Sequence, residues 1–217
     1  MNFLKRVRVV PALALSLVAA ACATSAGKPA SGFLTNAIAR AYMPLEGAAY
    51  LVLEGRGAAM VVAPGVAVTN AHNANLVASE QIIGTSIEYD LLFFRTTHSD
   101  PPPQGEPTPG ETVIAYGEGT NGELRMARGR VRWTDAPVLP RCRGCAVQHA
   151  FAFDADAGKG FSGGPVVDAR DGRLVGIVFG FRDDVPQMHG RMMYAYDMHR
   201  IAAELARLHK PAASAGR

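Results

Sequence analysis

The chain has 217 residues, of which 48% are hydrophobic and 19% are charged, a composition typical of a globular protein with material for a sizeable core. Its formal net charge of +3 equals the charge of Lys5, Arg6 and Arg8, which lie in a segment that we expect to be removed. The rest of the chain has no excess of positive charge, which argues against a nucleic-acid-binding protein.

Residues 1–22 have the pattern of a secretory signal peptide, in which a basic start precedes the apolar run Val9 to Val18 and then small residues. The run is short for a transmembrane helix. Ala21-Cys22-Ala23 fits ordinary cleavage, whereas Ala19 to Cys22 resembles a bacterial lipobox, with Ala19 where Leu is usual. We favour a lipoprotein of the periplasm or outer membrane, lipidated at Cys22, over a secreted protein. Residues 23–32, rich in small residues and Pro, predict a flexible tether.

Short apolar runs separated by Gly, Pro and polar turns occupy most of the remaining chain. Residues 33–42 predict a short helix or an arm. The runs that predict strands are 49–54, 58–63, 66–69, 81–87, 90–95, 112–117, 124–133, 149–153, 165–168, 174–181 and 191–196. Strands of this length and spacing are typical of a barrel or a sandwich, and not of βαβ units.

Two segments interrupt this pattern. His98 to Glu111 is rich in Pro and Gly, which predicts an extended strap between two subdomains. Near the end, Met198, Ile201, Leu205 and Leu208 recur at helical spacing before Pro211. We therefore expect an amphipathic helix over 198–209 and a tail over 211–217.

Cys142 and Cys145 lie in the motif Cys-Arg-Gly-Cys. In an exported protein two cysteines this close most often form a local disulfide. Free thiols are one alternative. A zinc site that includes His149 is another, although only three ligands are present nearby.

A single serine lies among glycines in Gly158 to Pro165. Its hydroxyl becomes a nucleophile when a base takes its proton and N–H groups hold the resulting oxyanion. Flanking glycines would let the N–H groups of Gly160 and Ser162 point into one space. A simple glycine turn is the plainer interpretation. The stretch also matches the G-x-S-x-G elbow of α/β-hydrolases, with Asp197 and His199 downstream, but that elbow needs a helix where this sequence has a strand-like run.

The best base upstream is His72, which closes the apolar run from Val66, because histidine is the usual general base near neutral pH. Asp90 begins the apolar run 90–95. A carboxylate there needs a partner, so it would orient the imidazole of His72. Asp100 is the fallback for this role, in Pro-rich surroundings that predict an exposed loop.

Three stretches in this order carry a resemblance to a known family: Thr69-Asn70-Ala71-His72, Tyr89-Asp90-Leu91-Leu92 and Gly160-Phe161-Ser162-Gly163-Gly164-Pro165. They resemble the trypsin-like serine peptidases, close to the bacterial HtrA-type and glutamyl-endopeptidase-type protease domains, without a PDZ domain. The resemblance implies an all-β fold of two antiparallel six-stranded β-barrels with the site between them. The peptidase domain would span 33–210, with barrel 1 at about 44–97, the strap at 98–111, barrel 2 at about 112–197 and the helix at 198–209.

The resemblance also implies a mechanism without metal or organic cofactor. Ser162 would attack a carbonyl, His72 would take and return the proton, and Asp90 would orient His72. The N–H groups of Gly160 and Ser162 would form the oxyanion hole. Phe161 occupies a position where trypsins have Asp and HtrA-type enzymes often have Asn, so a trypsin-type zymogen switch is not expected.

Candidate specificity residues are Asp156, six residues before Ser162, and the aromatic side chains of Phe179 and Phe181. We therefore predict an exported serine endopeptidase that acts on proteins or peptides, with membrane attachment through lipid at Cys22 and no nucleic-acid partner. One alternative is a protein of the same fold that binds peptides or a protein partner without cleaving. The other is an esterase that uses the G-x-S-x-G stretch.

Overall fold

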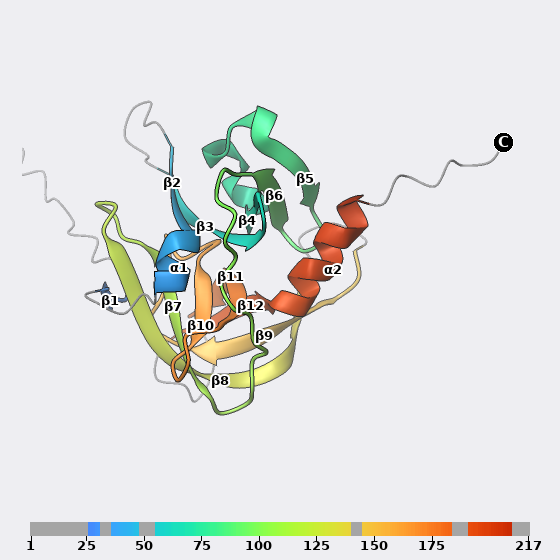
Figure 1. Cartoon of the computed structure of the whole chain (residues 1–217). Coiled ribbons are helices and arrows are strands. Elements are labelled where there is room, and N and C mark those ends of the chain that lie inside the picture. Colours follow the sequence, from blue (N-terminus) through green and yellow to red (C-terminus); the bar gives the residue numbers. More distant parts are fainter. Residues whose placement is uncertain (1–25, 31–35, 48–54, 140–144, 184–190, 210–217) are drawn as a thin grey trace, which may run out of the picture.

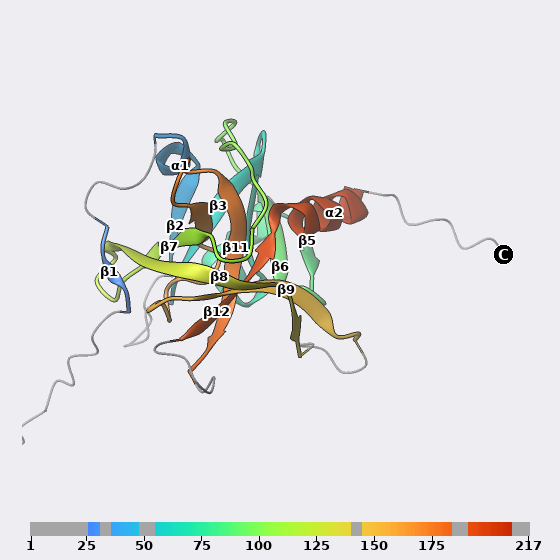
Figure 2. The same cartoon turned by 90° about the horizontal axis from the view of Figure 1, so that it is seen from below.

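A computed structural model of the chain describes residues 26–30, 36–47, 55–139, 145–183 and 191–209. Two β-sheets pack together, and a C-terminal helix lies beside both (Figures 1 and 2). In chain order the elements are β1 (Lys28–Pro29), α1 (Asn36–Ala41), β2 (Tyr42–Glu46), β3 (Arg56–Ala63), β4 (Val66–Asn70), η1 (Ala71–Leu76), η2 (Ser79–Gln81), β5 (Ile82–Ser86), β6 (Leu91–Arg95), β7 (Thr112–Glu118), β8 (Leu124–Val138), β9 (Gln148–Asp154), β10 (Pro165–Asp168), β11 (Leu174–Arg182), β12 (Met192–Asp197) and α2 (Met198–His209).

The second sheet is a closed antiparallel barrel. Its strand order is β1-β8-β7-β10-β11-β12-β9, and the additional pairing of β8 with β9 closes six of these strands on themselves. Apolar side chains fill its interior, among them Phe151, Phe153 and Val166. The prediction of a six-stranded barrel with a C-terminal helix is confirmed for this half of the chain.

The first sheet has five strands in the order β2-β3-β4-β6-β5 within the described residues. The strand predicted over 49–54 lies outside these residues. Sequence patterning missed β2, which contains Pro44. Since Pro lacks an N–H donor it is confined to edge strands and bulges, and β2 is indeed at the edge of this sheet. One apolar cluster joins the two sheets, with Met60 and Phe93 on one side and Ile177 on the other.

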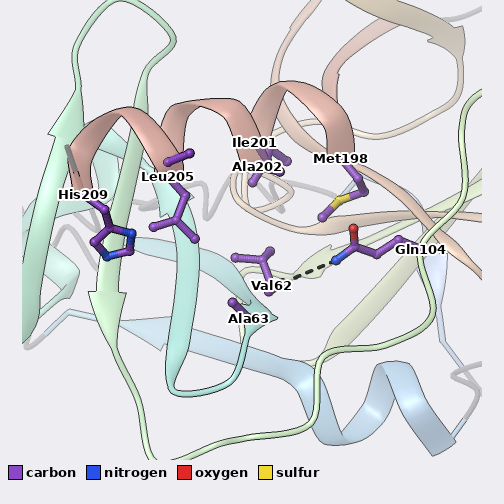
Figure 3. Close-up of a pocket in the computed structure, with 9 residues that line it drawn as sticks. Val62, Ala63, Gln104, Met198, Ile201, Ala202, Leu205 and His209 are labelled. Atoms are coloured by element: carbon purple, nitrogen blue, oxygen red, sulfur yellow. Dashed lines mark hydrogen bonds between the residues drawn. The ribbon is translucent and has the colours of Figure 1, made fainter.

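The helix α2 has the predicted bounds, and its apolar side faces the first sheet and the strap across a pocket of about 260 Å³ (Figure 3). Met198 and Ile201 are buried. Gln104 of the strap lies opposite and donates to the carbonyl of Val62 at 3.3 Å. The buried carboxylate of Glu204 accepts a hydrogen bond from Ser86 at 2.8 Å, which ties the helix to β5. Neither helix in the described ranges is long and apolar enough to cross a membrane.

The Pro-rich strap, residues 98–111, crosses between the sheets and is held along its length. Gln104 forms a parallel bridge with Leu174. The Leu174 N–H donates to the carbonyl of Pro103, and the Gly105 N–H donates to that of Leu174, both at 2.9 Å. The strap therefore supplies backbone hydrogen bonds to the start of β11.

The N-terminal residues 26–30, which we expected to belong to a flexible tether, lie against the second barrel. Lys28 and Pro29 pair with Arg125 and Met126 of β8. The Arg125 guanidinium also donates to the carbonyls of Ala26, at 2.8 Å, and Gly27. Backbone pairing and these side-chain donors fix this part of the chain.

Several predictions concern residues outside the described ranges. These are the signal sequence, the lipidation site Cys22 and Cys142. Cys145 is disulfide-bonded, and its pairing with Cys142 stays a prediction.

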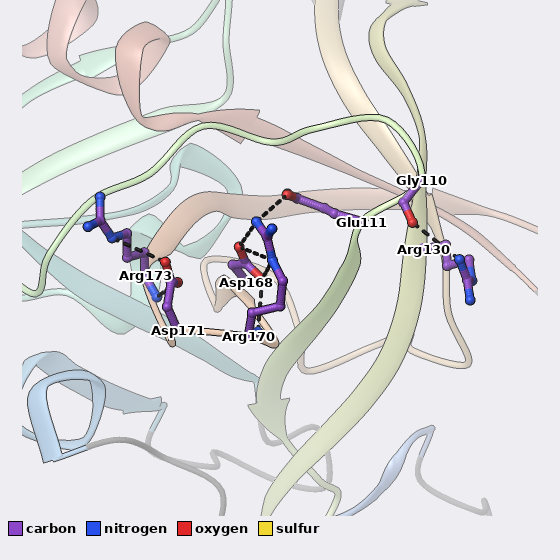
Figure 4. Close-up of polar contacts among 7 residues, drawn as sticks. All are labelled: Gly110, Glu111, Arg130, Asp168, Arg170, Asp171 and Arg173. Carbon is purple, nitrogen blue, oxygen red and sulfur yellow. Dashed lines mark hydrogen bonds and ion pairs between the residues drawn. The ribbon is translucent and has the colours of Figure 1, made fainter.

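The strands β10 and β11 form a hairpin, and ion pairs surround its turn (Figure 4). Buried Asp168 accepts from the backbone N–H of Arg170 at 2.9 Å and from its guanidinium at 2.6 Å. These hydrogen bonds hold the pKa of Asp168 below its ordinary value. Asp171 and Arg173 form a second pair nearby, and both of these side chains are exposed.

We predict that Asp168→Asn lowers the free energy of unfolding at pH 7 by about 1–2 kcal/mol, since a buried charge-assisted hydrogen bond is lost. A carboxylate with a lowered folded pKa stabilises the fold above its unfolded pKa, about 3.9, and this contribution disappears as the pH falls through the folded pKa. Urea denaturation at pH 7 and pH 3 should show the wild-type advantage shrinking in acid. Asp171→Asn is the control, with an expected change under about 0.5 kcal/mol. Equal losses in both variants would contradict this assignment.

Candidate active site

His72 and Asp90 meet because the strands that carry them are neighbours. His72 follows β4 in η1, Asp90 immediately precedes β6, and β4 pairs with β6 so that Asn70 lies opposite Leu91. The Nδ1 atom of His72 is 2.7 Å from Oδ2 of Asp90. The backbone N–H of His72 donates to Oδ1 of the same carboxylate at 3.0 Å. One carboxylate therefore fixes both the main chain and the ring of His72.

Asp90 is only 4% exposed and has a positive φ of 51°. Asp is one of the few side chains that adopt this region without great strain. Its carbonyl oxygen accepts from the Ala71 N–H at 2.8 Å and from the side-chain amide of Asn70 at 3.2 Å. A buried carboxylate is costly unless hydrogen-bonded, and its contacts with His72 meet this requirement. The imidazole is more accessible, with 37% of its side chain exposed.

Ser162 lies in a loop whose glycines are needed for close approach. Gly160 and Gly163 have φ values of +90° and +79°, and a Cβ at either position would lie 1.9 Å from a backbone carbonyl oxygen. The N–H groups of Phe161, Gly163 and Gly164 donate to backbone carbonyls. Within the described part of the chain, the N–H groups of Gly160 and Ser162 donate to no backbone carbonyl. These two donors are the ones that sequence analysis assigned to an oxyanion hole.

His72, Gly160 and Ser162 line one pocket of about 370 Å³. His72 and Ser162 thus come together across the two sheets. The other lining residues, which sequence analysis did not single out, are Arg56, Asn73, Glu118, Gly119, Thr120 and Lys159. Asn73 directly follows His72 and Lys159 directly precedes Gly160, so adjacency to the motifs was the signal that could have indicated them.

Glu118 forms a largely buried acidic part of this pocket. The Tyr42 hydroxyl donates to its Oε1 at 2.5 Å. Burial raises the pKa of Glu118, and the hydrogen bond from Tyr42 partly opposes that change. Burial raises the pKa of the Tyr42 hydroxyl well above its ordinary value, and the hydrogen bond to Glu118 adds to the increase. Arg56 lies beside them and pairs with Glu46 at 2.5 Å.

Phe161, the residue before the serine, points away from the pocket into the closed barrel. It is completely buried in the apolar cluster inside the barrel. A Cβ added at Gly27 would lie 2.9 Å from its ring, so the ring also reaches the N-terminal segment. Phe161 thus anchors the serine loop to the barrel core.

The three candidate specificity residues lie outside this pocket lining. Asp156 is exposed on the loop after β9. Phe179 is buried and stacks on Tyr196, with ring centroids 4.2 Å apart. Phe181 lies under the guanidinium of Arg191, 4.9 Å from its ring centroid. Their effect on specificity stays a prediction.

The local structure at Ser162 and at His149 bears on the esterase and zinc interpretations. Pro165–Asp168, directly after the serine loop, is strand β10, so the helix that a nucleophile elbow requires does not follow Ser162. The imidazole of His149, the suggested zinc ligand, contacts the carboxylate of Asp135 at 2.7 Å. Among the described residues, no group of three or more His, Cys, Asp and Glu side chains could hold a metal ion.

The protein has a closed six-stranded antiparallel barrel that packs on another β-sheet. An Asp–His pair and a glycine-flanked serine meet at one pocket. Together these features define the chymotrypsin-like class of fold. The family model described as "Trypsin-like peptidase domain" matches residues 48–177. The chain therefore belongs to the trypsin-like peptidase family, and the family resemblance seen in the sequence is confirmed. A comparison with curated protein sequences finds no match.

Solved structures share this fold at low sequence identity. The active form of the Rv3671c protease from M. tuberculosis has a TM-score of 0.65 and 18% identity, with 97% of this chain and 95% of that chain covered. The MamO protease domain from Magnetospirillum magneticum gives 0.58 and 20%, with 78% and 97% covered. The HtrA-type protease AlgW with a tripeptide gives 0.57 and 20%, with 78% and 60% covered. Family and fold together support a serine-type peptidase.

We predict that Phe161→Ala destabilises the protein by about 3–5 kcal/mol, the usual cost of removing a buried Phe side chain from a packed core. Phe181→Ala makes the same chemical change at a partly exposed site and should cost clearly less. Urea denaturation of both variants measures the difference. If Phe161→Ala were as stable as wild type, the ring would not anchor the serine loop.

Proposed function

We propose that this protein is an exported serine endopeptidase that hydrolyses peptide bonds through Ser162, His72 and Asp90. The observation that carries the proposal is the two-point attachment of His72 to buried Asp90, beside Ser162 at the same pocket. Asp90 accepts a hydrogen bond from Nδ1 of His72. This leaves Nε2 as the nitrogen that can take the proton of Ser162 when a substrate is bound. The substrates would be peptides or proteins, as for other peptidases of this family.

The proposed reaction proceeds in two halves. The Oγ of Ser162 bonds to the scissile carbonyl carbon while Nε2 of His72 takes its proton, and the N–H groups of Gly160 and Ser162 stabilise the oxyanion. Collapse breaks the C–N bond, and His72 returns the proton to the leaving amine. Water then repeats the sequence on the acyl-enzyme, with His72 first as base and then as acid, and frees Ser162.

Export is part of the proposal and rests on the sequence of residues 1–22, with lipid attachment at Cys22 as the favoured form. This signal segment lies outside the described residues. Palmitate labelling in a bacterial host, compared between wild type and Cys22→Ala, would test the lipid. Unlabelled wild type would point to ordinary secretion instead.

We predict that a fluorophosphonate probe labels the wild-type mature chain and leaves Ser162→Ala unlabelled, because only an activated serine reacts. His72→Ala and Asp90→Asn should slow labelling by about 10³–10⁴-fold, through loss of the base and of its orientation. His98→Ala changes a histidine on the strap and serves as the control, with unchanged labelling. Gel fluorescence against time gives each rate.

A folded wild type that resists the probe would favour the alternative of a peptide-binding protein without catalysis. Normal labelling of Asp90→Asn would remove Asp90 from the mechanism while keeping the serine. Cleavage of small esters without cleavage of any protein or peptide would contradict the endopeptidase proposal.

A further inference from the structure

The residue after His72 contacts the nucleophile segment from the other sheet. Asn73 is 5% exposed, and its side-chain Nδ2 donates to the carbonyl oxygen of Ser162 at 3.3 Å. The same Nδ2 donates to Oγ1 of Thr69 at 3.0 Å. Because His72 and Asn73 are adjacent, one short segment makes both contacts. It contacts Asp90 through the imidazole of His72, and it contacts Ser162 through the side-chain amide of Asn73.

The direction of these hydrogen bonds is set by chemistry. A carbonyl only accepts, so the NH₂ group of Asn73 must face Ser162. The Thr69 hydroxyl donates to the carbonyl of Ala58 at 2.7 Å, and its oxygen is therefore an acceptor for the second amide hydrogen. The Ala58 N–H in turn donates to the Ser162 carbonyl at 2.9 Å. These bonds close a ring of hydrogen bonds that joins β3, β4, η1 and the serine loop.

The packing around Asn73 leaves little room for another arrangement. A Cβ at Gly57 would lie 2.7 Å from Nδ2 and 3.0 Å from Cγ of Asn73. Real Cβ atoms do not approach other atoms so closely, so the amide lies flat against the glycine backbone. Thr69, the second acceptor of this amide, is completely buried.

We propose that Asn73 is a positioning residue, whose amide holds the main chain of Ser162 in place relative to His72. This inference rests on the proposed serine chemistry. The Ser162 carbonyl receives two donors, the Ala58 N–H from β3 and Asn73 Nδ2 from the turn η1 that also carries His72. Removing the amide leaves one donor and lets the serine segment shift relative to the imidazole. Since small misplacements at the reacting atoms cost up to about 100-fold in rate, the effect should fall on the chemical step.

The test measures fluorophosphonate labelling of Asn73→Ala and Asn73→Asp. Asn73→Asp keeps the size of the side chain, and its carboxylate cannot donate to the Ser162 carbonyl. We expect the labelling rate constant to fall about 10- to 100-fold, with the final labelled fraction and the KM for a peptide substrate unchanged. Asn75→Ala, at an exposed position of the same turn, is the control and should label like wild type.

A merely structural role would give the opposite pattern, in which the labelled fraction and the thermal midpoint fall while the rate constant of the labelled molecules stays normal. That result would overturn the inference, as would wild-type rates in both Asn73 variants.

Hydrogen exchange provides a readout that does not depend on activity. The amide hydrogen of Ala58, bonded to Ser162, should exchange at least about tenfold faster in Asn73→Ala, while amides in β12 keep their protection. Unchanged exchange at Ala58 would also overturn the inference. If the wild type resisted the probe altogether, the proposed function would fail, and exchange at Ala58 would still decide whether Asn73 orders the serine segment.

Discussion

Hydrogen bonds to the peptide carbonyl of Ser162 connect the two sheets, and the candidate site depends on this connection. The carbonyl belongs to the loop before β10, yet its donors, Ala58 and Asn73, belong to the first sheet and the turn after β4. A serine and a histidine from separate sheets can cooperate only if the sheets hold a fixed relation, because proton transfer requires hydrogen-bond reach. The shared apolar cluster holds the sheets together. Because apolar contact is not directional, the hydrogen bonds to the Ser162 carbonyl are needed to fix the orientation of one sheet relative to the other.

Buried polar residues gather on the first-sheet side of this connection. Among them are Thr69, Asn70, Asn73 and Asp90. Each of them makes hydrogen bonds to the backbone or to another member of the group. Such a network is favourable only when its members are paired, since an unpaired polar group in a low-dielectric interior carries its full desolvation cost. The pairing of Asp90 with His72 avoids this cost for the carboxylate and also fixes the orientation of the His72 ring. Stability and positioning have the same physical origin at this pair, whereas Oδ1 of Asn70 is buried without a hydrogen-bond partner in the described part of the chain.

The sequence predicted the parts of this protein that depend on local pattern. Strand positions followed from apolar runs, α2 from helical spacing, and the site candidates from glycines around Ser162 and a carboxylate at the start of an apolar strand. It missed β2 because Pro44 disguises an edge strand, and it shortened β8, whose second half is mostly exposed. Adjacency to His72 could have pointed to Asn73, but its contact with Ser162 could not be predicted, because the two residues are 89 positions apart and only the fold brings them together.

Phe161 shows how a departure from the family pattern is accommodated. Its neighbour Ser162 faces the pocket, while its own ring is buried in the barrel. An ionic side chain at this position would need a partner inside the barrel, whereas a phenyl ring is held by apolar burial alone. The serine loop is therefore fixed from two sides. The ring of Phe161 holds it to the second barrel, and the carbonyl of Ser162 holds it to the first sheet. Gly160 and Gly163 let the chain pass between these two anchors, because a Cβ at either would collide with backbone.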